Sequence, residues 1–252
     1  MTPEIIAHRG ASADAPENTL AAILLAWQLV ADAAEIDVLL TADGEIVAIH
    51  DETMLRTAGV DWAVATHSLA ELKTLDVGSW KSSRFKGERI PTLAEVLEIV
   101  PPGKRLFIEV KCGPEAIPEL KRTLAKANTS RVQTVLISLD FYTIVAAKQA
   151  LPDRVAFWVT EQFARGLSQQ CELGPPTAVL IERAIAVGMD GLDINDLPER
   201  PRGDIALIRQ AGLRSCIWTV NSVERAAWLR DEGMQSITTD VPAKLRAALS
   251  PP

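Results

Sequence analysis

The sequence contains little cysteine and lacks a surplus of positive charge. Three cysteines, Cys112, Cys171 and Cys216, lie far apart in 252 residues. An odd number at this spacing supports neither a disulfide framework nor a zinc cluster. The net charge is −7, whereas nucleic-acid binding needs an excess of Lys and Arg on one face. These two shortages therefore argue against a disulfide-stapled fold, a zinc cluster and a nucleic-acid partner.

Long apolar runs are also missing. No uncharged apolar stretch in the sequence approaches the roughly 20 residues that span a bilayer. The chain does not open with a basic region, an apolar stretch and a cleavage site. From these absences and the few cysteines we expect a cytoplasmic protein without stable membrane association. The sequence does not indicate an oligomeric state.

What the sequence does contain is an alternation of short β-type runs and helical patterns. The composition, 48% hydrophobic and 23% charged, is that of an ordinary globular protein. We expect strands at Glu4–His8, Ala34–Leu39, Leu106–Lys111, Thr134–Ser138, Val155–Thr160, Gly191–Ile194, Ser215–Val220 and Ser236–Thr239. Helices are expected near Thr19–Val30, Leu93–Val100, Pro114–Ala127, Phe141–Ala150, Thr177–Val187, Asp204–Ala211, Val223–Glu232 and Pro242–Leu249.

This alternation predicts an α/β fold. About eight strand–helix units over roughly 250 residues match a (β/α)8 TIM barrel in count and length. An open doubly wound sheet is the alternative, but no G-x-G-x-x-G follows the first strand. We therefore expect residues 1–252 to form one TIM-barrel catalytic domain.

One interval, between Thr41 and Pro91, interrupts the alternation. It contains an Asp43-Gly44 turn, an apolar run at Glu45–Ile49, then His50-Asp51 and mostly polar sequence with a short helix near Leu69–Leu75. We interpret it as an excursion from the loop after the second strand that lies over the mouth of the barrel. It makes residues 51–91 a small insertion within the domain.

Three acids occupy two of the expected strands. Glu35 and Asp37 are two residues apart and so face the same side of the second expected strand. Glu109 and Lys111 repeat the arrangement at the end of the third expected strand. Carboxylates on an apolar face are costly without a compensating cation. If the two strands are neighbours, the three acids can form an oxygen cage for one divalent cation, Mg²⁺ or Ca²⁺. The alternative is a layer of Glu–Lys or Glu–Arg ion pairs inside the barrel.

The three histidines differ in their positions. His8 ends the first strand and His50 ends the apolar run attached to the second, so both can reach the rim that carries the acids. Together with Arg9, Lys111 and a metal, they suit a phosphate ester, because cations neutralise the phosphate while two imidazoles transfer protons. His67 precedes a helix start and is interpreted as a surface residue.

Two further positions have competing interpretations. Trp218, at the end of the seventh expected strand, either forms a wall of the mouth that covers the apolar side of a small polyol or packs in the core. Asn18 and Thr19 precede the first helix and are interpreted as capping residues.

The residues at these positions resemble the glycerophosphodiester phosphodiesterases, in order and spacing over nearly the whole chain. The matching segments are "AHRG" (Ala7–Gly10), "PENT" (Pro16–Thr19), "EIDV" (Glu35–Val38), "T-x-D-G-x-x-V-x-x-H-D" (Thr41–Asp51), "GERIPTL" (Gly87–Leu93), "IEVK" (Ile108–Lys111), "WTVN" (Trp218–Asn221) and "TTD" (Thr238–Asp240).

The resemblance implies a TIM barrel that hydrolyses glycerophosphodiesters to an alcohol and sn-glycerol 3-phosphate. It implies a divalent cation held by Glu35, Asp37 and Glu109, an acid–base pair of His8 and His50, and Arg9 and Lys111 on the phosphate. The chain departs from the family pattern at Leu55, where an acid is common, and at Ser138-Leu139, where Ser-Phe is common. Both departures lie outside the expected metal and histidine set and concern substrate preference.

In the resulting hypothesis, His8 removes a proton from the attacking oxygen and His50 protonates the departing alcohol. The attacker is either water or the glycerol's own 2-hydroxyl, and the sequence leaves the head group open. One alternative is a related barrel enzyme that acts on an intact phospholipid. It is disfavoured because the chain shows no basic amphipathic helix. The other is a barrel that binds phosphorylated ligands without turnover, in which a histidine or an acid would be missing.

Overall fold

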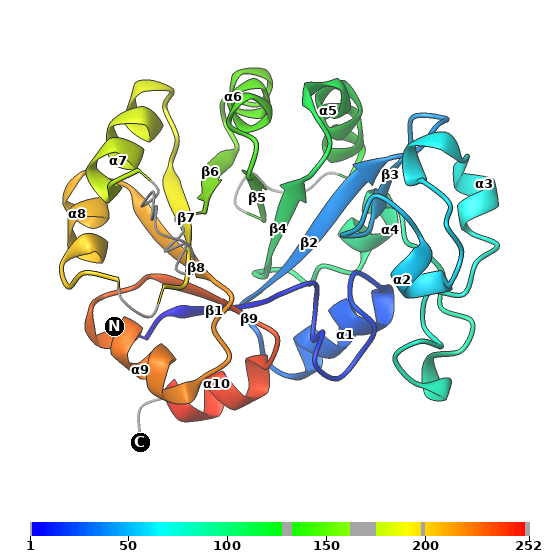
Figure 1. Cartoon of the computed structure of the whole chain (residues 1–252), viewed down its shortest axis with the longest axis horizontal. Coiled ribbons are helices and arrows are strands. Elements are labelled where there is room, and N and C mark those ends of the chain that lie inside the picture. Colours follow the sequence, from blue (N-terminus) through cyan, green and yellow to red (C-terminus); the bar gives the residue numbers. More distant parts are fainter. Residues whose placement is uncertain (1, 128–132, 162–174, 198–199, 250–252) are drawn as a thin grey trace, which may run out of the picture.

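Eight parallel strands close into a barrel, and helices surround it (Figure 1). The structure is a computed structural model that describes residues 2–127, 133–161, 175–197 and 200–249. Strand β1 pairs with both β2 and β9, which closes the sheet. The predicted TIM barrel is therefore confirmed, and the doubly wound sheet, whose two edges stay open, is excluded. The barrel strands are β1 Glu4–Ala7, β2 Ala33–Leu40, β4 Arg105–Val110, β5 Thr134–Ser138, β6 Val155–Thr160, β7 Gly191–Asn195, β8 Arg214–Trp218 and β9 Ser236–Thr239.

Several helices of the outer layer start where the sequence supplies a capping side chain. Thr19 accepts from the Ala22 N–H at the start of the first helix, and Ser222 accepts from the Arg225 N–H at the start of the ninth. The predicted helix from Pro114 instead opens with a 3₁₀ turn, η3 Pro114–Ala116. The helices are α1 Leu20–Gln28, α4 Leu93–Glu98, α5 Ile117–Lys126, α6 Phe141–Ala150, α7 Thr177–Ala186, α8 Asp204–Gln210, α9 Val223–Asp231 and α10 Pro242–Leu249.

Alternate residues of each strand face the helices or the barrel interior. Outward-facing side chains such as Ile36, Ile108 and Leu192 form the main core with the helices. A smaller cluster inside the barrel includes Phe107 and Phe157, whose rings meet edge to face with centroids 6.0 Å apart. This inner layer fills the barrel below the carboxyl ends of the strands. The polar residues that face inward therefore lie at the mouth.

The segment after β2 forms a side structure with its own apolar core. It includes β3 Ile46–Ala48, antiparallel to β2, then α2 Leu55–Ala58, η1 Val64–Thr66, α3 Leu69–Leu72 and η2 Ser83–Phe85. Its buried core residues are Leu39, Val47, Ile49, Met54, Val64, Leu72, Val77 and Ile90. In Figure 1 these elements lie beside β2, at the side of the barrel, and not across its mouth as we expected. The reason is that β3 extends the sheet laterally from β2. The boundaries 51–91 and the single catalytic domain stay predictions.

No helix among the described residues is both long and apolar enough to cross a membrane. Cys112 and Cys216 are free thiols. Cys171 lies outside the described residues.

Candidate active site

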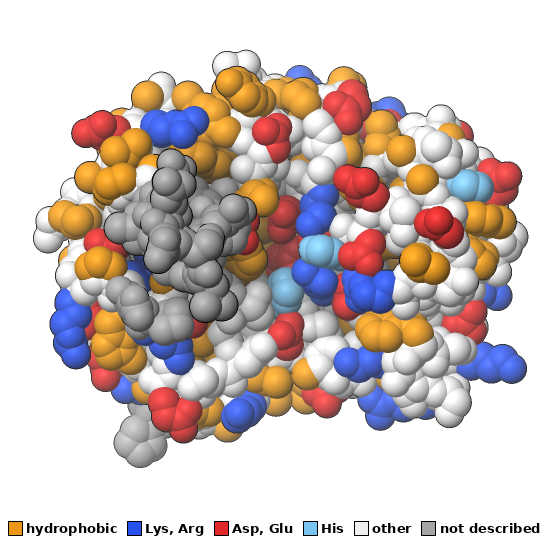
Figure 2. Space-filling model, in the orientation of Figure 1, with side chains coloured by type: hydrophobic (Ala, Val, Ile, Leu, Met, Phe, Trp, Pro, Cys, Tyr) orange, Lys and Arg blue, Asp and Glu red, His pale blue; other side chains and the backbone are white. Residues whose placement is uncertain are grey.

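A cavity of about 270 Å³ opens at the carboxyl ends of the barrel strands. Figure 2 shows acidic, basic and histidine side chains gathered around a hollow near the centre of this face. The mouth of a parallel barrel is where such folds hold their ligands. The lining residues are His8, Arg9, Glu35, His50, Glu109, Lys111, Ile137, Leu139, Val159, Glu161, Asp193, Trp218 and Thr238. Seven of the eight residues predicted from the sequence are among them, and the eighth, Asp37, contacts two of these seven.

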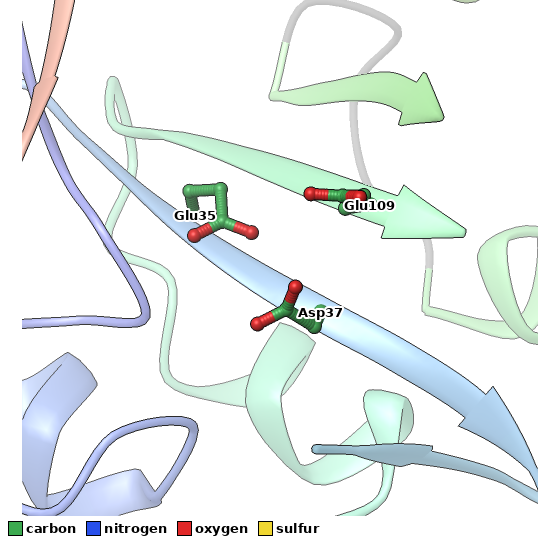
Figure 3. A group of neighbouring side chains, drawn as sticks. All are labelled: Glu35, Asp37 and Glu109. Atoms are coloured by element: carbon green, nitrogen blue, oxygen red, sulfur yellow. The ribbon is translucent and has the colours of Figure 1, made fainter. Parts of the chain in front are cut away.

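Three carboxylates converge on one side of the cavity (Figure 3). Glu35 and Asp37 lie on β2, and Glu109 pairs in register with Asp37 on the adjacent β4. One oxygen from each side chain lies within 4.8 Å of the others. Glu35 and Asp37 are buried, with exposed fractions of 4% and 1%. The predicted adjacency of the two acidic strands is therefore confirmed.

Two cations contact this cluster, and both pair with the same acid. Arg9 Nε lies 3.1 Å from Asp37 Oδ2, and Lys111 Nζ lies 3.7 Å from Asp37 Oδ1. The backbone N–H of Arg9 donates to Glu35 Oε2 at 2.8 Å. Within the described residues, Glu35 Oε1 has no hydrogen-bond partner although it is buried, and Glu109 has neither a hydrogen bond nor an ion pair. An ion-pair layer alone leaves these two acids without cations.

The unmatched acids have raised pKa values. Burial, followed by repulsion from Asp37 and Glu109, raises the pKa of Glu35 well above its usual value. Burial and the charge of Asp37 raise the pKa of Glu109 to about 7. A hard divalent ion would supply the positive charge that both carboxylates lack, and their oxygens are the ligand type it prefers. The donor set therefore fits Mg²⁺ or Ca²⁺.

Asn18 was predicted to cap a helix, and that prediction is wrong. Its side-chain N–H donates to Asp37 Oδ2 at 2.8 Å, and its Oδ1 accepts from the Asp37 backbone N–H at 3.1 Å. The left-handed φ of +56° at Asn18 turns the side chain away from the helix and toward β2, and asparagine tolerates this conformation. Thr19 alone caps α1, as predicted. Asn18 thus fixes the orientation of one carboxylate of the cluster.

His8 is held from behind by Asp240. The His8 Nδ1 lies 2.7 Å from Asp240 Oδ1, and Ser12 and Asn221 also donate to this carboxylate. Burial opposes ionisation of Asp240, but the hydrogen bonds from His8 and its neighbours keep its pKa well below the usual range. An ionised carboxylate accepts only, so the proton of this contact belongs to Nδ1. The Nε2 of His8 is then available to a ligand.

His50, like His8, is held by an aspartate through its Nδ1. Its Nδ1 lies 2.7 Å from Asp51 Oδ1, and Arg56 Nε donates to Asp51 Oδ2 at 2.7 Å. The hydrogen bond from Arg56 lowers the pKa of Asp51 to about 2. Glu17 accepts from Arg56 at 2.7 and 2.9 Å and from Arg9 at 2.9 Å. A continuous chain of contacts therefore joins the two sides of the site.

Sequence reasoning missed the supporting residues. Asp51, Glu17 and Asp240 stand in the quoted motifs, but nothing in a local pattern indicates what they contact. Asp193, a lone acid between two apolar residues of β7, also lines the cavity. Like Glu35, Asp193 is an acid inside an apolar strand, but it has no second acid two residues away to single it out.

The structure also locates the two remaining residues discussed from the sequence, Trp218 and His67. Trp218 lines the cavity and also packs against the inner cluster of the barrel, so both interpretations describe it. His67 stacks on Trp62 at 4.6 Å in the side structure and does not line the cavity, consistent with a structural residue.

Comparisons with known proteins agree with this geometry. The model of the glycerophosphoryl diester phosphodiesterase family matches residues 8–244. A glycerophosphodiester phosphodiesterase of Caldanaerobacter subterraneus is 35% identical over 251 residues, covering 97% of each chain. A Bacillus subtilis enzyme of the same name is 30% identical over 256 residues, covering 94% of this chain and 83% of its own. A phosphodiesterase of Oleispira antarctica, solved in complex with the product sn-glycerol-3-phosphate, superposes with a TM-score of 0.87 at 30% identity, covering 98% of this chain and 96% of its own.

Proposed function

We propose, for a chain that belongs to the glycerophosphoryl diester phosphodiesterase family, the hydrolysis of glycerophosphodiesters to an alcohol and sn-glycerol 3-phosphate. The observation that carries the proposal is one cavity that holds two histidines, each bonded through Nδ1 to an ionised aspartate, beside a carboxylate cluster. The product bound to the Oleispira antarctica enzyme supports the same reaction.

The cofactor of the proposal is one divalent cation, Mg²⁺ or Ca²⁺, which Glu35, Asp37 and Glu109 would hold. Bound there, it would neutralise charge on the phosphate oxygens as a Lewis acid. The support from this chain is the buried Oε1 of Glu35 and the carboxylate of Glu109, neither of which has a hydrogen bond or an ion pair among the residues that the structure describes.

The two histidines would move the protons. Asp240 orients the His8 ring and Asp51 orients the His50 ring, and within the described residues no hydrogen bond occupies Nε2 of either ring, which could then serve the substrate. We assign His8 as the base that takes a proton from the attacking oxygen and His50 as the acid that protonates the leaving alcohol. The attacking oxygen is that of water or of the glycerol 2-hydroxyl; in the second case a cyclic phosphate forms as the alcohol leaves, and water must then open it to give sn-glycerol 3-phosphate.

Arg9 and Lys111 would bind the phosphodiester. Both line the cavity and both lie beside the carboxylate cluster. Their charges would stabilise the negative charge that develops on the phosphate oxygens. Trp218 would cover an apolar part of the substrate at the same wall.

The proposal includes the organisation of the chain. Residues 1–252 would act as one catalytic domain, and the insertion at 51–91 would serve the site by holding Arg56 against Asp51 and Glu17. The small-molecule substrate is the only partner proposed, and a cytoplasmic location stays a prediction.

The experiment measures release of sn-glycerol 3-phosphate from glycerophosphodiesters of choline, ethanolamine, glycerol and inositol. Each reaction is run with Mg²⁺, with Ca²⁺ and with a chelator. Metal-dependent release supports the proposal, and the panel ranks the head groups. Absence of release from every substrate, with a metal still bound, contradicts it and favours a phospholipid substrate or a binding function.

A further inference from the structure

Asp193 lies on the wall of the barrel opposite the carboxylate cluster. Around the closed barrel, β7 is separated from β2 by β4, β5 and β6 in one direction and by β1, β9 and β8 in the other. Asp193 is in register with Val159 on β6 and Cys216 on β8, which belong to the inner cluster. Its side chain therefore points into the barrel, where it lines the cavity.

This carboxyl group is buried without a cation. Asp193 is 3% exposed, and in the part of the chain that the structure describes its Oδ1 has no hydrogen-bond partner and no Lys, Arg or His forms an ion pair with it. Its polar neighbour is the thiol of Cys216, a weak donor. A buried carboxyl oxygen without a partner destabilises the fold. Since Asp193 lines the cavity, a ligand group can form the hydrogen bond that its carboxyl group lacks.

The surroundings indicate which part of the substrate lies here. The buried side chains of Ile137, Val159 and Thr238 line the cavity together with Trp218, and Val159 is in register with Asp193 on the adjacent strand. At the mouth the cavity is lined by the more exposed Leu139, Glu161 and Lys111. The enclosed end suits a group that is common to all substrates, and the open end suits an alcohol that varies. The common group of glycerophosphodiesters is the glycerol unit.

A small polyol matches an apolar wall with one acid. The C–H face of the glycerol unit can pack on Ile137, Val159 and Trp218 while a hydroxyl reaches the carboxyl group. With the phosphate at Arg9 and Lys111, the hydroxyl farthest from phosphorus extends across the barrel toward β7. Burial raises the pKa of Asp193 to about 7, so that near neutral pH the group both donates and accepts hydrogen bonds.

We propose that Asp193 binds the terminal hydroxyl of the glycerol unit and thereby selects glycerol esters over phosphodiesters that lack this hydroxyl. This inference rests on the proposed function. A site built to bond a buried hydroxyl rejects the analogue without it, because the protein group is then left unpaired. No covalent step is involved, and Asp193 is a specificity-determining residue.

The test compares two substrates that differ by one hydroxyl: glycerophosphocholine and the phosphocholine ester of propane-1,2-diol, which keeps the 2-hydroxyl. The wild type should prefer the glycerol ester in kcat/KM by about 100-fold or more. In Asp193→Ala the preference should fall below about tenfold, mainly through loss on the glycerol ester. Asp193→Asn keeps a hydrogen-bonding group and should retain more of the preference than Asp193→Ala.

Val159→Ala is the matched control, because it changes the shape of the same wall without removing a polar group. It should affect both substrates alike and leave the preference near the wild-type value. Thermal unfolding of each variant verifies folding. A preference that is unchanged in a folded Asp193→Ala overturns the inference.

Other outcomes distinguish failure of this inference from failure of the proposed function. If Asp193→Ala changes only the ranking between glycerophosphoethanolamine and glycerophosphoglycerol, the carboxyl group faces the leaving alcohol and the inference is wrong. Hydrolysis of glycerophosphocholine by the wild type without any preference overturns this inference alone. If the wild type hydrolyses neither substrate nor any other glycerophosphodiester, the proposed function fails as well.

Discussion

The Nδ1 of His8 lies 2.7 Å from the Oδ1 of Asp240, 232 positions later in the chain. His8 follows β1 and Asp240 follows β9, and these two strands are paired residue by residue from Glu4–Ser236 to Ala7–Thr239. Closure of the barrel therefore creates the contact. A histidine that emerges from the first strand receives its orienting carboxylate from the last.

Replacement of Asp240 by asparagine should remove the charge behind His8. The amide cannot stabilise a protonated imidazole as the carboxylate does, and it can favour the wrong ring tautomer. We expect kcat for glycerophosphocholine to fall by about 100-fold or more, with a smaller change in KM. Asp14→Asn, an exposed acid in the loop after β1, should remain near wild type. A kcat for Asp240→Asn that is within threefold of wild type would show that His8 does not need this partner.

Glu17→Gln tests the chain of contacts between the two sides of the site. Glu17 bonds both Arg9 and Arg56, and Arg56 in turn holds Asp51. The neutral amide weakens both bonds, and hydrogen bonds to charged groups contribute about 1.5–3 kcal/mol, equivalent to about ten- to hundredfold. We expect a loss of that size in kcat/KM in steady-state assays. Asp61→Asn, an exposed acid of the side structure, serves as the control, and equal activity of the two variants would refute the role of Glu17.

Binding of the divalent cation should weaken as the pH is lowered. Without the ion, burial and the charge of Asp37 raise the pKa of Glu109 to about 7, and the pKa of Glu35 is raised as well. The ion must then displace protons, so affinity rises with pH through about 7. Calorimetric titration with Mg²⁺ or Ca²⁺ at pH 5.5, 7 and 8.5 measures it. Glu109→Gln should bind more weakly with a flatter pH dependence, and an affinity that is independent of pH would contradict the account.

The free energy of unfolding should depend on pH through Asp193. Burial raises its pKa to about 7 in the folded protein, compared with about 3.9 in an unfolded chain. The folded state therefore keeps a proton that the unfolded state has released. The stability this contributes is complete below pH ~4 and is lost as the pH rises to about 7.

Asparagine at position 193 does not titrate. In urea unfolding of the metal-free protein, the stability of Asp193→Asn relative to wild type should therefore be greater at pH 8 than at pH 5. The exposed Asp61→Asn should show the same difference from wild type at both values. If the difference for Asp193→Asn is also the same at both values, the carboxyl group titrates normally.

Local sequence patterns predicted the barrel because its elements are local. Thr134–Ser138 and Val155–Thr160 are short apolar runs with polar flanks, and both strands have the predicted bounds. Period-two alternation likewise put Glu35 and Asp37 on one face. The same alternation was available for Asp193, but one acid on a strand without a second acid beside it indicates no metal site.

Local sequence patterns could not predict contacts between segments that are far apart in the chain. Asn18 precedes a helix, and a local reading makes it a cap, whereas the closed barrel brings it to Asp37 on β2. Arg56 lies in the side structure, and its bonds to Glu17 depend on how that structure packs beside β2. In both cases tertiary packing decides between partners that the sequence pattern cannot rank.

The most direct measurement is the rate of sn-glycerol 3-phosphate release from glycerophosphocholine by the wild type, His8→Ala and His50→Ala at saturating Mg²⁺ or Ca²⁺. If the two histidines are the acid–base pair, each variant should lose about 100-fold or more in kcat while it still binds the metal. A variant that keeps more than about a tenth of the wild-type kcat would show that its histidine transfers no proton in the rate-limiting step, and the proposed mechanism would be wrong.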